Sequence, residues 1–281
     1  GRSMRCRERG GRMEAGGQLA GVVNRSERFV DDLTGQPVNP ELCRIARQKE
    51  IDYFRSKGVW DMRRVQEAWS KTGRPPISVR WVEVSKGDDE HPNYRSRLVA
   101  REIRMAGSDS IFAPTPPLES LRMVLSYAVT DFPDEPRKVR DPKSPHRSQV
   151  LAIDISRAYF NAVTREDEPT YVELPPEFSV PAGTSALLKR HLYGTQRAAD
   201  GWQNECSGTL IGFRFVQGAA SSCVFRHKQW QLVCSVHGDD FTVSGPCSSL
   251  DWFEAAMKSK YELTVGGRLG PGPDDEKEIS V

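Results

Sequence analysis

Apolar and polar positions alternate in several short segments of the chain, and this pattern predicts strands. Residues 75–84 alternate Ile77, Val79 and Trp81 with polar or basic partners. Residues 94–103 are the expected hairpin partner of that strand, across a polar turn. Further strands are expected at residues 149–155, 169–176, 222–227, 230–236 and 241–245.

Other segments repeat their apolar residues at roughly helical spacing. The first is residues 39–62, where Asn39 and Pro40 supply an N-cap and first-turn signal. Further helices are expected at residues 117–129, from residue 156, from near Gln196, and at residues 249–263. Strands and helices are mixed without strict βαβ alternation, so the expected fold class is α+β.

Composition divides the chain into folded parts and polar segments. Hydrophobic residues make up 37% of the 281 residues, enough for a packed core, and the formal net charge of +2 does not indicate a partner. Residues 1–38 contain a Gly- and Arg-rich stretch and are expected to be a disordered tail. Residues 131–148 are rich in Pro and charge, which predicts a surface insertion between folded parts at 39–130 and 149–265. Residues 266–281 end on what reads as the start of another element, so we expect a fragment of a longer chain.

The six cysteines are scattered and form no C-x-x-C pair. We interpret them as free thiols of a protein from a reducing compartment. The sequence contains neither an apolar run long enough to cross a membrane nor a secretory signal, so we expect an intracellular protein without a membrane partner.

The acidic pair in "SVHGDDFTVSG" stands between two apolar strands, which predicts a β-hairpin. Gly238 and Asp239 are expected as the central residues of a type II′ turn, because glycine supplies the positive φ that the first position needs. Asp240 would then begin the exit strand. Taken alone, this pattern is typical of a solvated turn.

A third carboxylate, Asp154, ends the apolar strand in "VLAIDISRAYF". A lone aspartate at such a position is commonly the N-cap of a helix. If this strand were a neighbour of the hairpin, however, Asp154, Asp239 and Asp240 would lie together and would need a cation. Oxygen ligands suit Mg²⁺, and two such ions serve an in-line phosphoryl displacement.

The order of several motifs carries more information than any one of them. The series "RSRLVAREI…APTPPLESLRMVLSYA…AIDISRAYFNAV…EPTYVELPPEF…LLKRHLYGTQRAADGW…SSCVF…VHGDDF" resembles the reverse transcriptase domain of copia-type LTR retrotransposons over roughly residues 58 to 270. The resemblance implies a right-hand polymerase fold with a ferredoxin-like antiparallel sheet and packed helices. Residues 39–130 would contain the fingers, residues 149–265 the palm, and residues 266–281 the start of a truncated thumb.

The resemblance also implies roles for single residues. Asp154, Asp239 and Asp240 would bind two Mg²⁺ ions, with Mn²⁺ as an alternative, and join deoxynucleoside triphosphates (dNTPs) to a primer 3′-OH on an RNA or DNA template. Tyr159 would pack under the deoxyribose and exclude a 2′-OH; without that role it would be a core aromatic of a helix. The implied partners include other parts of a retroelement polyprotein, and the implied compartment is cytoplasmic particles or the nucleus.

Basic residues would hold the substrate. Arg95, Arg97 and Arg101 match the finger strand that grips the triphosphate, although they would also suit a solvated strand face. His237 and Gly238 replace the Tyr-Val of the family and would contact the primer end. In "LYGTQRAADGW" the nucleotide-positioning Gln of the family falls at Arg197, with Gln196 one position early. A one-residue slip would point the Gln elsewhere on a helix.

Two alternatives remain open at this stage. A degenerate or domesticated copy would bind nucleic acid without polymerase activity, and the displaced Gln and the absent downstream parts favour it. A viral RNA-dependent RNA polymerase also uses a G-D-D motif. That class usually has an aspartate at the position of Tyr159, so the aromatic side chain argues for DNA synthesis.

Overall fold

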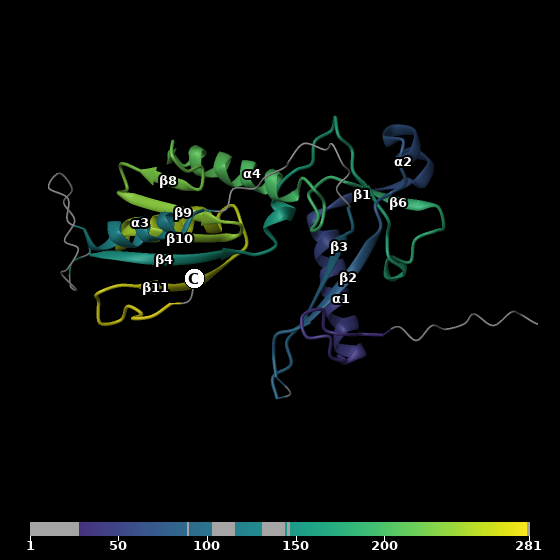
Figure 1. Ribbon diagram of the computed structural model, residues 1–281, viewed down its shortest axis with the longest axis horizontal. Coiled ribbons are helices and arrows are strands. Elements are labelled where there is room, and N and C mark those ends of the chain that lie inside the picture. Colours follow the sequence, from purple (N-terminus) through teal and green to yellow (C-terminus); the bar gives the residue numbers. More distant parts are fainter. Residues whose placement is uncertain (1–27, 89, 103–115, 131–143, 145–146, 280–281) are drawn as a thin grey trace, which may run out of the picture.

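The computed structural model describes residues 28–88, 90–102, 116–130, 144 and 147–279 (Figure 1). Its largest sheet has six antiparallel strands in the order β11-β4-β10-β9-β8-β7. The bounds of these strands are Ser148–Ile155 (β4), Val216–Gln217 (β7), Val224–His227 (β8), Leu232–His237 (β9), Asp240–Pro246 (β10) and Leu263–Leu269 (β11).

Two long helices complete a known arrangement around this sheet. The helices are α4 (Ala198–Gly212) and α5 (Cys247–Lys258). With the shorter intervening elements left out, the chain runs β4-α4-β9-β10-α5-β11, while in space the strands lie in the order β11-β4-β10-β9. This is the ferredoxin-like arrangement. The expected α+β class with a ferredoxin-like antiparallel sheet is confirmed.

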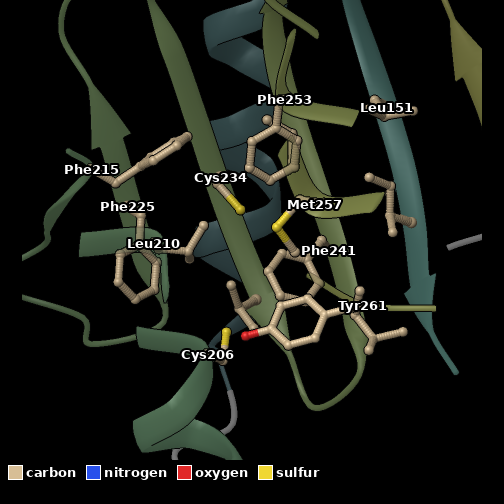
Figure 2. Close-up of a cluster of buried hydrophobic side chains, with 14 of the residues drawn as sticks. Leu151, Cys206, Leu210, Phe215, Phe225, Cys234, Phe241, Phe253, Met257 and Tyr261 are labelled. Carbon is tan, nitrogen blue, oxygen red and sulfur yellow. The ribbon is translucent and has the colours of Figure 1, made fainter. Parts of the chain in front are cut away.

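The face of this sheet toward α4 and α5 is apolar. Strand side chains alternate between the two faces, and every second residue of the central strands joins one buried cluster, including Leu151, Cys234 and Phe241 (Figure 2). The helices add Leu210 from α4 and Phe253 from α5 to the same cluster. The hydrophobic effect therefore fixes both helices on one side of the sheet.

The opposite face of the sheet is only partly covered. Helix α3 (Leu118–Val129) packs there, with Val124 and Tyr127 against Val233 of β9. The hydroxyl of Tyr127 donates to the carbonyl of Gln231, 3.4 Å away, which precedes β9 and lies at the other end of that strand from His237. The helix thus reaches the end of the sheet that is remote from the hairpin tip.

The amino-terminal part builds a second core around helix α1 (Pro40–Lys57). Asn39 caps this helix by accepting backbone N–H bonds from its first turn, as expected. The predicted hairpin is also confirmed: β2 (Val79–Ser85) pairs with β3 (Tyr94–Ala100) in antiparallel register. A three-stranded sheet, the short helices and one buried cluster that includes Phe54, Leu98 and Phe160 complete this part. Their bounds are Trp60–Arg64 (β1), Val65–Thr72 (α2), Ala158–Asn161 (η1, a 3₁₀ helix), Tyr171–Val172 (β5), Pro176–Phe178 (η2) and Thr184–Leu188 (β6).

Several expected boundaries differ from the structure. Residues 28–38, assigned to a disordered tail, form a turn in which the carboxylate of Asp31 accepts N–H bonds from Thr34 (2.8 Å) and from Ser85 of β2 (2.7 Å). The helix expected from residue 156 is a single 3₁₀ turn. Residues 131–143 and 145–146 of the insertion lie outside the described residues. The boundary expected at residue 265 falls inside β11, which pairs with β4.

Candidate active site

The tip of the β9–β10 hairpin is a two-residue turn. His237 pairs with Asp240, so Gly238 and Asp239 are its central residues, as the sequence predicts. Gly238 has φ +63°, and Asp239 is not among the residues of positive φ, which fits a type II′ turn. A Cβ atom added at Gly238 would meet no atom within 4 Å. Glycine is therefore favoured here by backbone conformation and not by lack of space.

Two hydrogen bonds hold this turn from neighbouring elements. The indole N–H of Trp202 in α4 donates to the carbonyl oxygen of Gly238 at 2.7 Å. The backbone N–H of Ile155, at the end of β4, donates to the carbonyl oxygen of Asp239 at 2.9 Å. A freely solvated turn would have water in both places, so the position of the tip is fixed by the sheet and by α4.

Strand pairing brings Asp154 to the hairpin. Asp154 of β4 is directly opposite Asp240 of β10 in the antiparallel register. Both residues alternate with core residues, Ile153 and Phe241 respectively, so their side chains lie on the face away from α4 and α5. Directly opposite residues have their Cβ atoms about 4.5–5.5 Å apart. Both side chains are exposed, at the end of the face that α3 leaves open.

The charge of Asp239 acts on the two facing carboxylates, Asp154 and Asp240. Partial burial, and then the charge of Asp239, raise the pKa of Asp154. Partial burial, followed by the charges of Asp239 and Asp154, raises the pKa of Asp240. Among the described residues, none of the three aspartates has a salt bridge. Their mutual repulsion makes this end of the sheet a place where a cation would be stabilised.

Cations and aromatic rings from outside the six-stranded sheet border the carboxylates. Arg97 of β3 and Lys86, beyond β2, both lower the pKa of Asp154 through their charges. The guanidinium of Arg97 lies over the ring of Tyr193, 4.4 Å from its centroid. Tyr193 in turn packs against Tyr159, with the ring centroids 4.9 Å apart. Carboxylates of the sheet and a basic, aromatic wall therefore share one site.

Tyr159 lies on η1, the short turn after β4. Burial and then the charge of Asp239 raise the pKa of its hydroxyl, while Arg97 acts in the opposite direction. The ring is only partly buried, and it packs at the edge of the large apolar cluster. Tyr159 thus contributes to the core with one side and faces the carboxylates with its polar end.

The order of strands, the paired aspartates and this wall coincide with a match to a known family. A family model described as reverse transcriptase (RNA-dependent DNA polymerase) matches residues 59–270. The chain belongs to the reverse transcriptase family. A search among curated proteins gave no match. The matched range contains every candidate residue named from the sequence.

The donor atoms at this end of the sheet fit Mg²⁺ only in part. Among the residues that the structure describes, no group of three His, Cys, Asp or Glu side chains is close enough to hold a metal ion by itself. Mg²⁺ is usually bound by one or two carboxylates together with waters and substrate phosphates. Asp154 and Asp240, facing each other across two strands, provide such a pair. The site therefore fits an ion shared with a phosphorylated substrate and not a closed protein cage.

The other two candidate arginines, Arg95 and Arg101, lie on β3 and just after it. Arg95 is on the same face of β3 as Arg97, two residues toward the hairpin turn, since Ser96 and Leu98 between and beyond them are buried. Arg101 follows the end of β3 and is exposed. Of the three, only Arg97 has an electrostatic contact with the aspartates that the structure shows. His237 is exposed, and its charge lowers the pKa of Asp240.

The sequence predicted a helix from near Gln196, but Gln196 and Arg197 do not lie on a helix. Helix α4 begins at Ala198, and both residues lie in the turn before it. The backbone N–H of Gln196 donates to Glu102 at 2.7 Å, and Arg197 pairs with Glu168 at 2.6 Å. They line a polar cavity whose described lining includes none of the three aspartates. The structure does not bring them to the site.

Sequence reasoning missed Tyr193, Lys86 and Trp202. Tyr193 and Trp202 both fall within the "LYGTQRAADGW" motif, so their place in a matched motif was an available signal. Lys86 lies in the polar turn of the β2–β3 hairpin, and its sequence is typical of a solvated loop. Only the approach of this hairpin to the six-stranded sheet brings Lys86 near Asp154. In the described part of the chain, no helix is long and apolar enough to span a membrane.

Proposed function

We propose that this chain is the polymerase domain of a copia-type LTR retrotransposon, joining dNTPs to a primer 3′-OH along an RNA or DNA template. The observation that carries the proposal is the direct pairing of Asp154 with Asp240, with Asp239 at the adjacent hairpin tip. The motif order in the sequence supports the copia-type assignment. The other partners would be parts of the same polyprotein, and the reaction would take place in cytoplasmic particles or in the nucleus.

The residues of the site have separable tasks in this reaction. Asp154, Asp239 and Asp240 would hold Mg²⁺, or Mn²⁺ in its place, together with the triphosphate. The bound ions would supply Lewis acidity toward the 3′-OH and neutralise phosphate charge. Arg97 would grip the triphosphate, since a guanidinium donates two parallel hydrogen bonds to phosphate. His237 and Gly238 at the tip would contact the primer end.

Tyr159 would select the sugar. Its ring packs against Tyr193 at a tilted angle and is therefore held in place beside the aspartates. A ribose carries a 2′-OH where deoxyribose has hydrogen, and a fixed aromatic ring there leaves no room for it. This role favours DNA synthesis over RNA synthesis, and an assay that offers both dNTPs and ribonucleoside triphosphates distinguishes the two.

Primer extension tests the proposal. The protein is incubated with a primed RNA template, dNTPs and Mg²⁺, and the length of a labelled primer is measured. Wild type is expected to extend the primer and Asp239→Asn is not. Asp52→Asn is the matched control, because Asp52 is 62% exposed on α1 and contacts side chains of the same helix, Arg55 at 3.7 Å and Gln48 at 2.8 Å.

A second candidate is a copy that binds nucleic acid without polymerase activity. The displacement of Gln196 and Arg197 from the aspartates favours it, because the family places a nucleotide-positioning Gln there. Binding of the primer–template by wild type, with no extension, would reject the polymerase and support this candidate. Extension that is lost in Asp239→Asn and kept in Asp52→Asn would reject this candidate.

A further inference from the structure

The loop that leaves β4 after Asp154 has an unusual backbone at Arg157. This residue has φ 50° and ψ 48°, the left-handed conformation that side chains other than those of Gly, Asn and Asp rarely adopt. Such conformations persist only where the surroundings hold them. The contacts of the Arg157 side chain therefore show what keeps this loop in place.

Those contacts come from helix α1. The Nε of Arg157 donates to a carboxylate oxygen of Glu50 at 2.9 Å. The guanidinium also lies over the ring of Tyr53, 4.1 Å from its centroid. The Glu50 side chain is only 3% exposed. A buried carboxylate is costly without a partner, so the pair couples the loop to the helix strongly.

The carboxylate of Glu50 also lies near Arg97 and Tyr193, which border the aspartates. The second oxygen of Glu50, Oε1, is buried and has no hydrogen-bond partner among the described residues. The hydroxyl oxygen of Tyr193 is likewise buried without such a partner. Burial raises the pKa of Glu50, and the charges of Arg157 and Arg97 oppose that rise. The charge of Glu50 thus acts on Arg97, the arginine that lies over Tyr193.

The loop that the pair holds carries the sugar-facing residue. The N–H of Phe160 donates to the carbonyl of Arg157 at 3.0 Å, which closes the turn around Tyr159. On the other side, Phe54 of α1 packs edge-on against Phe160, with the centroids 5.1 Å apart. A shift of Arg157 would therefore move Tyr159 relative to Asp154.

We propose that Glu50, acting through Arg157, is a positioning residue that sets Tyr159 against Asp154. Helix α1 would then be a working part of the polymerase site, although it lies before residues 59–270, the range matched by the family. This inference rests on the proposed function for its kinetic consequences. Its structural consequence, the anchoring of residues 155–161, does not depend on activity.

Four variants of the full chain test it. Glu50→Gln keeps the shape of the side chain and removes its charge. Arg157→Gly keeps the left-handed backbone without strain and removes the ion pair. The double variant Glu50→Gln/Arg157→Gly measures whether the two act as one unit. Glu41→Gln is the matched control, since Glu41 is exposed on the same helix.

The kinetic readouts are the KM for dNTP and the preference for dNTP over ribonucleotide. Both single variants are expected to raise KM about tenfold and to lower the sugar preference about tenfold, because small displacements of a positioning group are costly. The double variant should be no worse than the worse single variant, and Glu41→Gln should match wild type. Unchanged sugar preference in both single variants, or fully multiplicative effects in the double, would overturn the proposal.

Amide hydrogen exchange across residues 155–161 gives a readout without turnover. Glu50→Gln should speed exchange there and leave the core strand β9 unchanged, while Glu41→Gln changes neither. If wild type does not extend primers, the proposed function fails. Hydrogen exchange alone then tests whether Glu50 and Arg157 anchor residues 155–161. Equal exchange rates across residues 155–161 in Glu50→Gln and wild type would show that Glu50 does not anchor this loop. Should Glu50→Gln fail to fold, Arg157→Gly carries both readouts.

Discussion

The apolar face of the large sheet and the packing around α1 bury very different side chains. The cluster under α4 and α5, which includes Leu151, Phe241 and Phe253, contains no charged residue among those described. Around α1, the Arg47 side chain is 7% exposed and bonds to Glu83 of β2 at 2.7 Å, and Ser96 of β3 bonds to the same glutamate. Hydrophobic burial is not directional, whereas an ion pair fixes the angle and position of two elements.

This difference suits the tasks of the two regions. The apolar core of the sheet supports an opposite face that carries Asp154 and Asp240, with Asp239 at the adjacent turn, and the charge of Asp239 raises the pKa of both. In the proposed function, the packing around α1 would have to hold Arg97 and Tyr193 at a set position beside those carboxylates. Buried pairs such as Arg47–Glu83 and Glu50–Arg157 provide that directionality.

The largest effect is expected at the end of the six-stranded sheet that carries Asp154 and Asp240. Asp154→Asn removes one carboxylate of the facing pair and should lower primer extension by about a thousandfold, as for loss of a central electrostatic group. The rate of labelled-primer extension measures it. Near-normal extension at saturating Mg²⁺ would contradict the role of Asp154.

Truncation should destabilise both kinds of core, but for different physical reasons. Phe253→Ala leaves a cavity in the apolar cluster and should cost about 3–5 kcal/mol of unfolding free energy. Arg47→Ala should cost a similar amount, about 3–5 kcal/mol, because Glu83 is left as a buried unpaired charge. Urea unfolding measures both.

A compensated double change separates the two mechanisms. Replacing the pair by apolar residues, Arg47→Met with Glu83→Leu, should recover most of the loss in Arg47→Ala, since apolar replacements of buried pairs are often neutral. No such double replacement can be made in the apolar cluster, because its described residues include no ion pair. A double variant as unstable as Arg47→Ala would show that packing volume, not charge, dominates around α1.

The pH dependence of stability should reveal the repulsion at the open end. The pKa of Asp240 is raised on folding, so the folded state binds a proton more tightly than the unfolded chain. Stability is then lost as pH rises from the ordinary aspartate value of 3.8 through the raised folded pKa. Asp240→Asn should melt at a higher temperature than wild type at neutral pH and at the same temperature in acid. Melting curves across pH, without Mg²⁺, test this, and a variant that melts lower at neutral pH would contradict it.

The smallest effect is expected at the turn. Gly238→Ala places a side chain at φ +63° with open space around it, so backbone strain alone should cost about 1 kcal/mol. Urea unfolding should show this loss, and extension should fall only slightly. A loss of several kcal/mol would mean that the tip is packed more tightly than its surroundings indicate.

Local pattern and residue chemistry were enough for much of this protein. Alternation around "PPISVRWVEV" and "YRSRLVAREI" predicted the β2–β3 hairpin, and Gly238 predicted the turn between β9 and β10. These features depend on neighbours in sequence, where backbone preference and side-chain period act directly. The aspartates could be named as candidates for the same reason.

Only the tertiary structure decided which side chains meet. The facing of Asp154 and Asp240 depends on the register of two strands about 85 residues apart in the chain, which no local pattern encodes. The same holds for Glu50 and Arg157, whose pairing needs α1 to lie against the loop that follows β4. It also holds for Arg197, which sequence matching placed at the site and which instead pairs with Glu168 elsewhere. Sequence set the residue types and the local elements, while long-range packing and charge pairing decided the site.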